Sequence, residues 1–262
     1  MSQDDDLGLP PGIRDEYLQG ARDQLGAIAE LAERLIAGGD DVGAIEELRR
    51  DAHKLRGSAG SFGFDQATVV AAELEEAAKQ WLTHPADGMA TRGAATRGYV
   101  RRLAAALFTK QAALKAPLTT HDAPRTDTPP EPAHDSGDVP EVIVVEDDAA
   151  LADLLTFGLE ARGYRFVHYR NGREALDQLR ALDTHGTTPL LLLDVDLPAL
   201  DGYSIFEALQ TAHPGKFRVV FTTVHGSEAE QLRGLEAGAI DYMVKPMSLR
   251  VALEKIRRWV GR

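Results

Sequence analysis

The stretch that divides this chain reads KAPLTTHDAPRTDTPPEPAHDSGDVP and runs from Lys115 to Pro140. Six of its residues are proline, and most of the others are small or polar, so it contains almost no large apolar side chain. Such a segment cannot bury enough apolar surface to fold, and its prolines stiffen it. We therefore predict a linker over residues 115–140, with a separate domain on each side of it.

The sequence before the linker, residues 10–114, has the periodicity of amphipathic helices. Apolar side chains recur there at steps of three and four residues, which places them along one face of each helix. The first series is Ile13, Tyr17, Ala21, Leu25, Ile28, Leu31 and Leu35. Gly38, Gly39 and Gly63 interrupt the pattern, and further series follow as far as Leu114. Helices joined by short turns predict an all-α, antiparallel helical bundle.

The sequence after the linker, residues 141–262, alternates short apolar runs with helical segments. The runs are Val142–Val145, Tyr164–Tyr169, Leu190–Leu193, Phe217–Phe221 and Ile240–Val244. Near-continuous apolar strands that alternate with helices are typical of a parallel sheet that is covered on both faces. We therefore predict a multidomain protein in which a doubly wound α/β domain follows the helical bundle.

The overall composition excludes several classes of protein. The chain has 262 residues, enough for two domains, and its lack of cysteine excludes disulfides and thiolate metal sites. Its acidic N-terminus does not resemble a signal peptide, and no run approaches the roughly 18 apolar residues that cross a bilayer. A net charge of -12 argues against direct binding of nucleic acid, which requires clustered Lys and Arg. We expect a cytoplasmic protein that binds neither membranes nor nucleic acid.

His53 lies on the second predicted helix, among neighbours that suggest a reactive side chain. At about 100° per residue, Gly57 and Gly60 share its face of the helix, whereas Leu48 and Leu55 lie on the opposite side. We therefore expect the imidazole to point to solvent rather than into the core. Each glycine costs a helix about 1 kcal/mol relative to alanine, so two of them beside a nucleophile suggest a cleared docking area. An ordinary surface histidine is the alternative interpretation, and the other histidines are predicted to lie on the surface or in the linker.

The stretch that begins at His53 reads HKLRGSAGSFG and resembles the signature of histidine-containing phosphotransfer (Hpt) domains, a family of helical bundles. The matching positions are Leu55, Arg56, Gly57 and Gly63. Arg56 stands where the family more often has lysine, which keeps the charge but changes its geometry. The resemblance covers about residues 10–114. It implies that His53 carries a phosphoryl group, which Arg56 and Gly57 support and to which Lys54 adds a nearby cation.

The predicted strands of the α/β domain end in polar residues. Carboxylates follow the first and third strands, a hydroxyl the fourth and an ammonium the fifth: Glu146, Asp147, Asp148, Asp194, Thr223 and Lys245. Because the carboxyl ends of strands in an open parallel sheet lie along one edge, we expect these side chains to meet in one cleft. Each residue alone could be a helix cap or a turn residue, but the ordered set on strand ends indicates a shared site.

The chemistry of that set is typical of phosphoryl transfer. Clustered carboxylates repel one another unless a cation joins them, and oxygen ligands that leave room for waters suit Mg²⁺. The metal would neutralise charge on the moving phosphoryl group, and Thr223 and Lys245 could hold its oxygens. Asp194 would be the nucleophile and would form an aspartyl phosphate.

Three stretches of this domain resemble the receiver domain of two-component response regulators. They are VIVVEDD at residues 142–148, LLLDVDLPALDGY at 191–203 and GLEAGAIDYMVKPMS at 234–248. The resemblance runs along the whole domain and implies a five-stranded parallel sheet in the order 2-1-3-4-5. One departure is Val224, because family members usually have a small residue after the switch threonine.

The resemblance also implies a role for each residue of the cleft. Glu146 and Asp147 would form the acid pair, and Asp194 would accept the phosphoryl group. Mg²⁺ would bind beside Glu146, to the side chains of Asp147 and Asp194 and to the backbone carbonyl of Asp196. Lys245 would be the lysine of the site, and Thr223 and Tyr242 would be its switch pair. The Lys245–Pro246 bond is a candidate cis peptide bond.

Two functions of different kinds fit these motifs. In the first, the chain is a relay intermediate that a sensor histidine kinase, or another receiver or Hpt protein, loads, and phosphoryl groups pass between His53 and Asp194. In the second, the chain is an output switch in which phosphorylation of Asp194 reorganises Thr223 and Tyr242. This change would control a receiver-mediated homodimer, an effector domain outside this chain, or a partner. A non-catalytic binding module is a third interpretation, against which the complete cleft argues.

We predict that the protein cannot phosphorylate itself from ATP. The sequence has no GxxxxGKS or GxxxxGKT loop and no room for a kinase module, so we expect a phosphoryl carrier rather than an ATP-dependent enzyme. Purified protein mixed with Mg²⁺ and labelled ATP should stay unlabelled, whereas addition of a cognate sensor kinase should label it. Label from ATP alone would contradict this prediction.

Overall fold

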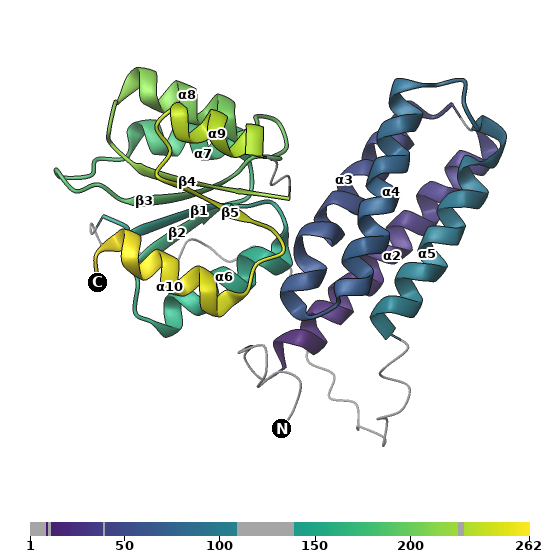
Figure 1. Cartoon of the computed structure of the whole chain (residues 1–262), viewed down its shortest axis with the longest axis horizontal. Helices are drawn as coiled ribbons and strands as arrows, with labels where there is room; N and C mark the ends of the chain where they lie inside the picture. Colours follow the sequence, from purple (N-terminus) through teal and green to yellow (C-terminus); the bar gives the residue numbers. More distant parts are fainter. Residues whose placement is uncertain (1–8, 10–11, 39, 109–138, 225–227) are drawn as a thin grey trace.

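The computed structural model describes residues 9, 12–38, 40–108, 139–224 and 228–262. These residues form an N-terminal helical domain and a C-terminal α/β domain, which lie side by side (Figure 1). The predicted linker over residues 115–140 lies outside the described residues except for its last two, and so does the predicted end of the last bundle helix at Leu114.

The N-terminal domain is a helical bundle, as predicted. Its long described helices are α2 (Ile13–Ala37), α3 (Val42–Ser58), α4 (Asp65–Thr83) and α5 (Arg92–Phe108). Asp41 begins α3, because its carboxylate accepts a hydrogen bond from the backbone N–H of Ala44. The apolar series meet along the bundle axis, where each helix contributes a fully buried side chain, among them Ile28, Leu48, Leu74 and Leu103.

The HKLRGSAGSFG stretch spans the end of α3. The α-helix ends at Ser58, and a tighter 3-10 turn continues it over Ala59–Phe62. Gly63 then has a φ of 79°, in the left-handed region that glycine tolerates best, and turns the chain into α4. His53 and the turn that follows it therefore lie at one end of the bundle.

The C-terminal domain is built around a five-stranded parallel sheet in the order β2-β1-β3-β4-β5, as predicted. The strands are β1 (Val142–Val145), β2 (Phe166–Tyr169), β3 (Leu190–Asp194), β4 (Arg218–Thr223) and β5 (Asp241–Val244). The helices are α6 (Ala149–Ala161), α7 (Gly172–Ala181), α8 (Gly202–Ala212), α9 (Glu228–Glu236) and α10 (Leu249–Val260). All residues of the central strands β1 and β3 are buried, which explains their continuous apolar runs.

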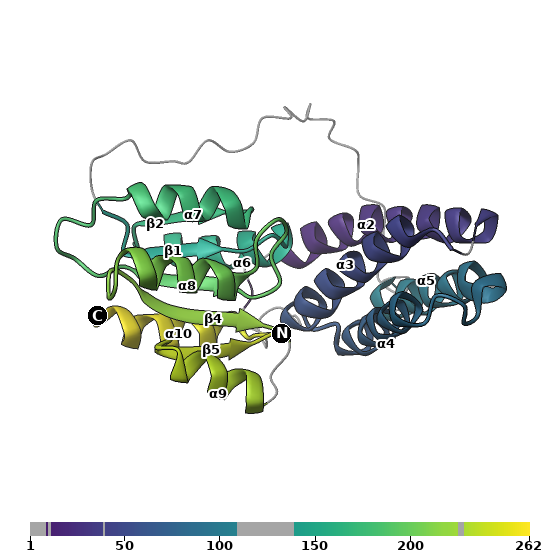
Figure 2. The same cartoon turned by 90° about the horizontal axis from the view of Figure 1, so that it is seen from above.

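Helices cover both faces of the sheet. α6 and α10 lie on one face, and α7 and α8 lie on the other with α9 beside them (Figure 1). β1 divides its side chains accordingly, since Val142 and Val144 join the core under α6 and α10, whereas Ile143 and Val145 join the core under α7 and α8. The carboxyl ends of the parallel strands share one edge, and this edge faces the helical domain at the C-terminal half of α3 (Figure 2).

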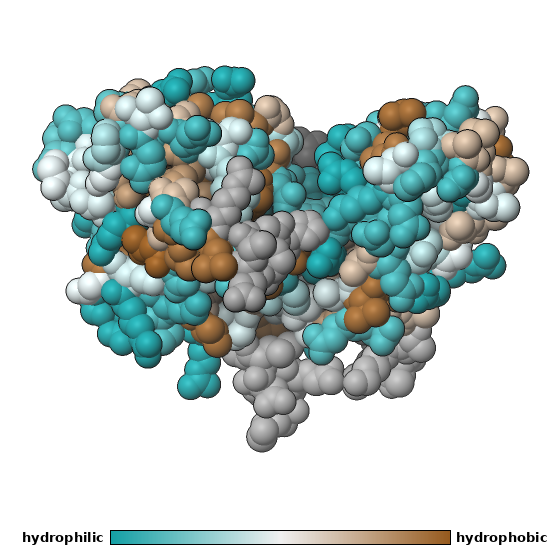
Figure 3. Space-filling model, turned by 45° about the horizontal axis from the view of Figure 1, so that its top comes forward, coloured by the Kyte–Doolittle hydropathy of each residue, from teal (hydrophilic) through white to brown (hydrophobic). Residues whose placement is uncertain are grey.

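On the face drawn in Figure 3, both domains are mainly hydrophilic, with several apolar patches. Exposed large apolar side chains include Val42 and Val69 on the helical domain and Phe157 and Val251 on the α/β domain. Scattered apolar residues of this kind are ordinary on protein surfaces. None of the described helices is long and apolar enough to span a membrane.

Candidate active site between the two domains

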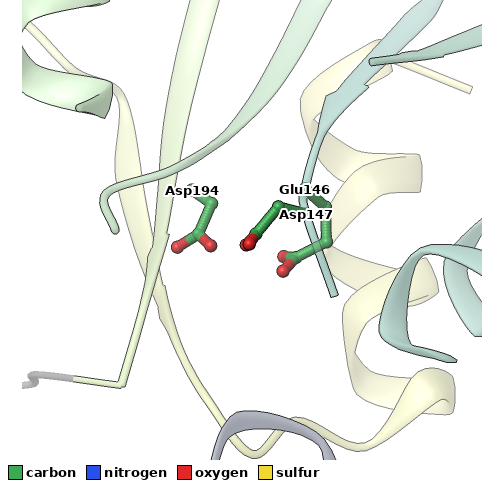
Figure 4. Close-up of side chains that lie close together, drawn as sticks. All are labelled: Glu146, Asp147 and Asp194. Carbon is green, nitrogen blue, oxygen red and sulfur yellow. The ribbon is translucent and has the colours of Figure 1, made fainter. Parts of the chain in front are cut away.

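Three carboxylates come together at the carboxyl edge of the sheet. Glu146 and Asp147 follow β1, and Asp194 is the last residue of β3, which pairs with β1. One ligand oxygen from each lies within 4.8 Å of the others, and the three side chains point toward a common space (Figure 4). Glu146 and Asp194 are each only 1% exposed. Their charges are therefore removed from most of the water that would otherwise screen them.

Lys245 supplies a cation to this acid cluster. It follows β5, and its buried Nζ lies 2.7 Å from Glu146 and 2.9 Å from Asp194. Burial alone would lower the pKa of Lys245, but the two carboxylates outweigh it and raise that pKa above its usual value. Burial and the neighbouring charge of Asp194 raise the pKa of Glu146. The oxygen-rich set fits a hard divalent cation such as Mg²⁺, and the Lys245–Pro246 peptide beside it is cis, as predicted.

The other predicted residues of the cleft lie around the acid cluster. Thr223 ends β4 and is buried. Tyr242 of β5 is buried as well, and its hydroxyl lies 2.7 Å from the hydroxyl of Tyr203. Asp148 has a separate task, because its carboxylate accepts a hydrogen bond from the backbone N–H of Leu151 and caps α6. The third acid after β1 therefore shapes the helix rather than the cluster.

His53 faces the acid cluster from α3. Its Nε2 atom lies 3.4 Å from a carboxylate oxygen of Asp196, two residues after Asp194, and its side chain is only 10% exposed. The prediction that His53 points to solvent is therefore wrong for the intact chain. The side chain points away from the bundle core, as the helical geometry predicts. The edge of the sheet covers it there, so it is not exposed to solvent. The metal-binding role of the Asp196 carbonyl stays a prediction.

Glu75 of α4 fixes the orientation of the His53 ring. Its carboxylate lies 3.1 Å from Nδ1 of His53, and it also pairs with Arg56 at 3.0 Å and with Lys79 at 2.8 Å. Burial opposes the ionisation of Glu75, but these cationic and hydrogen-bonding partners hold its pKa well below the usual range. An ionised Glu75 binds the proton on Nδ1. In the neutral ring, Nε2 then carries the lone pair and faces the α/β domain.

The two glycines beside His53 allow the domains to approach closely. A Cβ atom at Gly57 would lie 3.3 Å from Val224, and one at Gly60 would lie 2.4 Å from the ring of Pro246. The second distance is a severe clash. Both positions therefore face the α/β domain, on the side of α3 that the sequence assigns to docking.

Polar contacts surround these glycines. Arg56 donates to the backbone carbonyl of Val224 at 3.2 Å, and the backbone N–H of Met247 donates to the hydroxyl of Ser61 at 3.0 Å. The ammonium of Lys54 lies 2.9 Å from Asp147. Positive charge from the helical domain thus reaches the acid cluster directly.

Sequence reasoning missed Glu75, Ser61 and His168. Glu75 could have been predicted from the sequence, because it stands within the apolar face of α4 and a buried acid needs a cationic partner. Nothing local marks Ser61, whose partner is 186 positions away. His168 was predicted to lie on the surface, but it is half-buried on β2, and its Nε2 donates to the Glu146 carbonyl at 2.8 Å. That contact exists because β2 pairs with β1.

Comparison with known protein families agrees with this geometry. Residues 12–108 match the family model of the Hpt domain, and residues 142–257 match that of the response regulator receiver domain. The chain combines an Hpt domain with a receiver domain. This is the order that the sequence predicts, and the pair fits phosphorelay signal transduction in a two-component system. Such domains interact with kinases or with other phosphorelay proteins.

Individual relatives match part of the chain. It is 33% identical over 121 residues to the transcriptional regulatory protein CreB of Escherichia coli K12, and 36% identical over 117 residues to CpxR of the same organism. These matches cover 46% and 45% of this chain and 51% and 47% of the relatives. The chain thus spans about half the length of the curated relatives it matches.

Similar solved structures are receiver domains. One is the receiver domain of a sensor histidine kinase from Pseudomonas aeruginosa PAO1, with a magnesium ion coordinated in its active site cleft. It is 25% identical to this chain with a TM-score of 0.40, and the match covers 47% of this chain and 98% of that one. Another is a CheY-like receiver domain protein from Methanospirillum hungatei JF-1, which is 28% identical with a TM-score of 0.41 and covers 46% of this chain and 92% of that one.

We predict that Glu75→Gln slows phosphotransfer to His53 by on the order of 10- to 100-fold, because an amide no longer selects the ring tautomer with its proton on Nδ1. Glu76→Gln changes an exposed neighbour on the same helix and is the matched control. Nitrogen-15 NMR of the His53 ring should report mixed tautomers in the first variant only. An unchanged tautomer and rate would assign Glu75 to fold stability alone.

Proposed function

We propose that this protein is a phosphorelay carrier in which phosphoryl groups pass between His53 and Asp194 of the same chain. The observation that carries the proposal is the docking of His53, whose Nε2 faces the sheet edge beside Asp196, at the same edge as the acid cluster. Both reacting side chains are buried between the domains, where water competes less for the phosphoryl group. Tethering also replaces a bimolecular encounter by an intramolecular one, with effective concentrations of about millimolar for flexible tethers.

In the transfer step, one bond to phosphorus breaks and another forms. When the group leaves phosphorylated His53, the electron pair of the N–P bond returns to Nε2, and a carboxylate oxygen of Asp194 forms the new O–P bond. The reverse direction exchanges these two roles. Lys245 already contacts Asp194, so its ammonium would pair with the phosphoryl oxygens, and the Thr223 hydroxyl would donate to them.

We propose Mg²⁺ as the cofactor of this step. The side chains of Asp147 and Asp194 would hold it, beside Glu146 and with the Asp196 carbonyl as a further ligand. When bound, the ion supplies positive charge to the phosphoryl oxygens. Lys54 would add a further positive charge at Asp147 whenever the domains are docked.

We propose that the phosphoryl groups come from a separate protein, which is a sensor histidine kinase or another receiver or Hpt protein. The chain would act as a carrier and not as an ATP-dependent kinase. Its net charge of -12 favours protein partners over nucleic acid. Because docking buries His53 and the acid cluster together, such a partner would reach either site only after the domains separate.

A second candidate function is an output switch on the receiver domain. Exposed apolar side chains lie along α9, β5 and α10, namely Leu232, Leu235, Val244 and Val251. Tyr242 lies directly beneath Gly234 of α9, so a movement of Tyr242 on phosphorylation would alter this surface. Homodimerisation that depends on an acyl-phosphate mimic, measured by sedimentation, would favour this function over a pure relay.

We predict that label moves from Asp194 to His53 within one chain. The wild type, His53→Ala and Asp194→Ala would be incubated with Mg²⁺ and labelled acetyl phosphate, and acid and base stability would distinguish phosphohistidine from aspartyl phosphate. The wild type should carry both, His53→Ala only the aspartyl phosphate, and Asp194→Ala neither. The rate should not depend on protein concentration. If Asp194 loads and His53 never does, the internal relay is wrong.

We predict that Gly60→Leu lowers transfer between the two sites by on the order of 100-fold, because a displacement of the reacting groups by about 1 Å is enough for such a loss. The new side chain would clash with Pro246. Loading of Asp194 by acetyl phosphate should persist. Gly26→Leu on α2 is the control, since a Cβ there meets nothing within 4 Å. Equal transfer in both variants would refute the docked arrangement as the reactive one.

A further inference from the structure

A cavity of about 450 Å³ lies between the domains, separate from the space between His53 and Asp194. We call it the seam cavity, because α2 and α3 of the Hpt domain form one wall and the start of α6 in the receiver domain forms the other. Its walls include Ile13, Tyr17, Asp23, Asp51, Phe62 and Asp153. The volume is within the range of roughly 300–1,000 Å³ that is typical of sites for small organic molecules.

The seam cavity is strongly acidic. The carboxylates that line it come from both domains: Glu16, Asp23, Asp51, Asp147, Asp148 and Asp153. Lys54 is the one cation among the described residues that line it, and its ammonium already pairs with Asp147. Burial raises the pKa of Asp51, although the charges of Lys54 and Arg50 oppose this rise. A cleft lined by one charge sign concentrates counter-ions.

The seam cavity also has an apolar side with a polar atom. The ring of Tyr17 stacks on that of Phe62 with 4.1 Å between their centroids, and both rings line the cavity. Tyr17 is only 5% exposed, and Ser58, which also lines the cavity, is the hydrogen-bond partner of its hydroxyl. Buried hydroxyls normally have such a partner. Burial raises the pKa of Tyr17, so the hydroxyl keeps its proton and can both donate and accept.

We propose that the seam cavity binds a small organic cation, an amine with an apolar body. The ammonium group would pair with Asp51, and the body would lie on the aromatic side of the cavity, against Tyr17 and Phe62. Lys54 and Asp147 line both this cavity and the space beside His53, but Asp51, Tyr17 and Phe62 have no part in the proposed phosphotransfer or metal binding.

The inference rests on the docked arrangement of the proposed function. A ligand that touches both walls binds the docked arrangement more tightly than the separated one, so by linkage it stabilises docking by the same factor. Such an amine would favour transfer within the chain and would reduce the access of a separate partner to His53.

The test measures binding of 2-phenylethylamine to the full chain by calorimetry, without any phosphoryl donor. The neutral probe 2-phenylethanol, which has the same shape, should bind about tenfold more weakly or worse, because it lacks the charge-assisted hydrogen bond. Asp51→Asn should weaken amine binding by about the same factor. Glu30→Gln removes the same charge from an exposed position on α2 outside the cavity and should have little effect.

Other outcomes would overturn the inference. These are absence of amine binding, equal binding of amine and alcohol, or equal effects of Asp51→Asn and Glu30→Gln. Gly60→Leu should reduce amine binding whereas Gly26→Leu should not, and full binding in Gly60→Leu would overturn the assignment to both domains. Because no donor is present, failure of phosphotransfer with intact amine binding would count against the proposed function alone.

Discussion

Repulsion between three carboxylates at the edge of the receiver sheet is the constraint on which the rest of this structure depends. Glu146, Asp147 and Asp194 cannot move apart, because the paired strands β1 and β3 hold them. Lys245 compensates the cluster from within the receiver domain, and Lys54 does so from the Hpt domain. An edge that needs cations therefore suits both a hard divalent cation and the basic side chains at the end of α3.

The Hpt domain has a buried acid of its own at the domain boundary, Glu75. Glu75 binds Nδ1 of His53, so that Nε2 is the ring nitrogen that faces the receiver domain. The same carboxylate holds Arg56, which in turn donates to the carbonyl of Val224 in the receiver domain. One buried acid thus orients the imidazole and positions a docking contact.

Charge brings the two surfaces together, and shape decides how they meet. Gly60 admits the ring of Pro246, and Ser61 accepts a hydrogen bond from the backbone of Met247, so the turn after α3 fits the loop after β5. Val224 illustrates the same fit. The sequence marks it as unusually bulky for its position, and the structure places it against Gly57, where a side chain on the helix would crowd it.

The sequence by itself determined the two folds, because the apolar period of a helix and the apolar runs of buried strands are local properties. It also determined that Glu146, Asp147, Asp194 and Lys245 would meet, since parallel strands place their carboxyl ends at one edge. Only the tertiary structure decided that His53 is covered, that Glu75 holds its ring, and that a cavity lies between the domains. These features depend on contacts between residues far apart in the chain, and no local period records which surface a helix will meet.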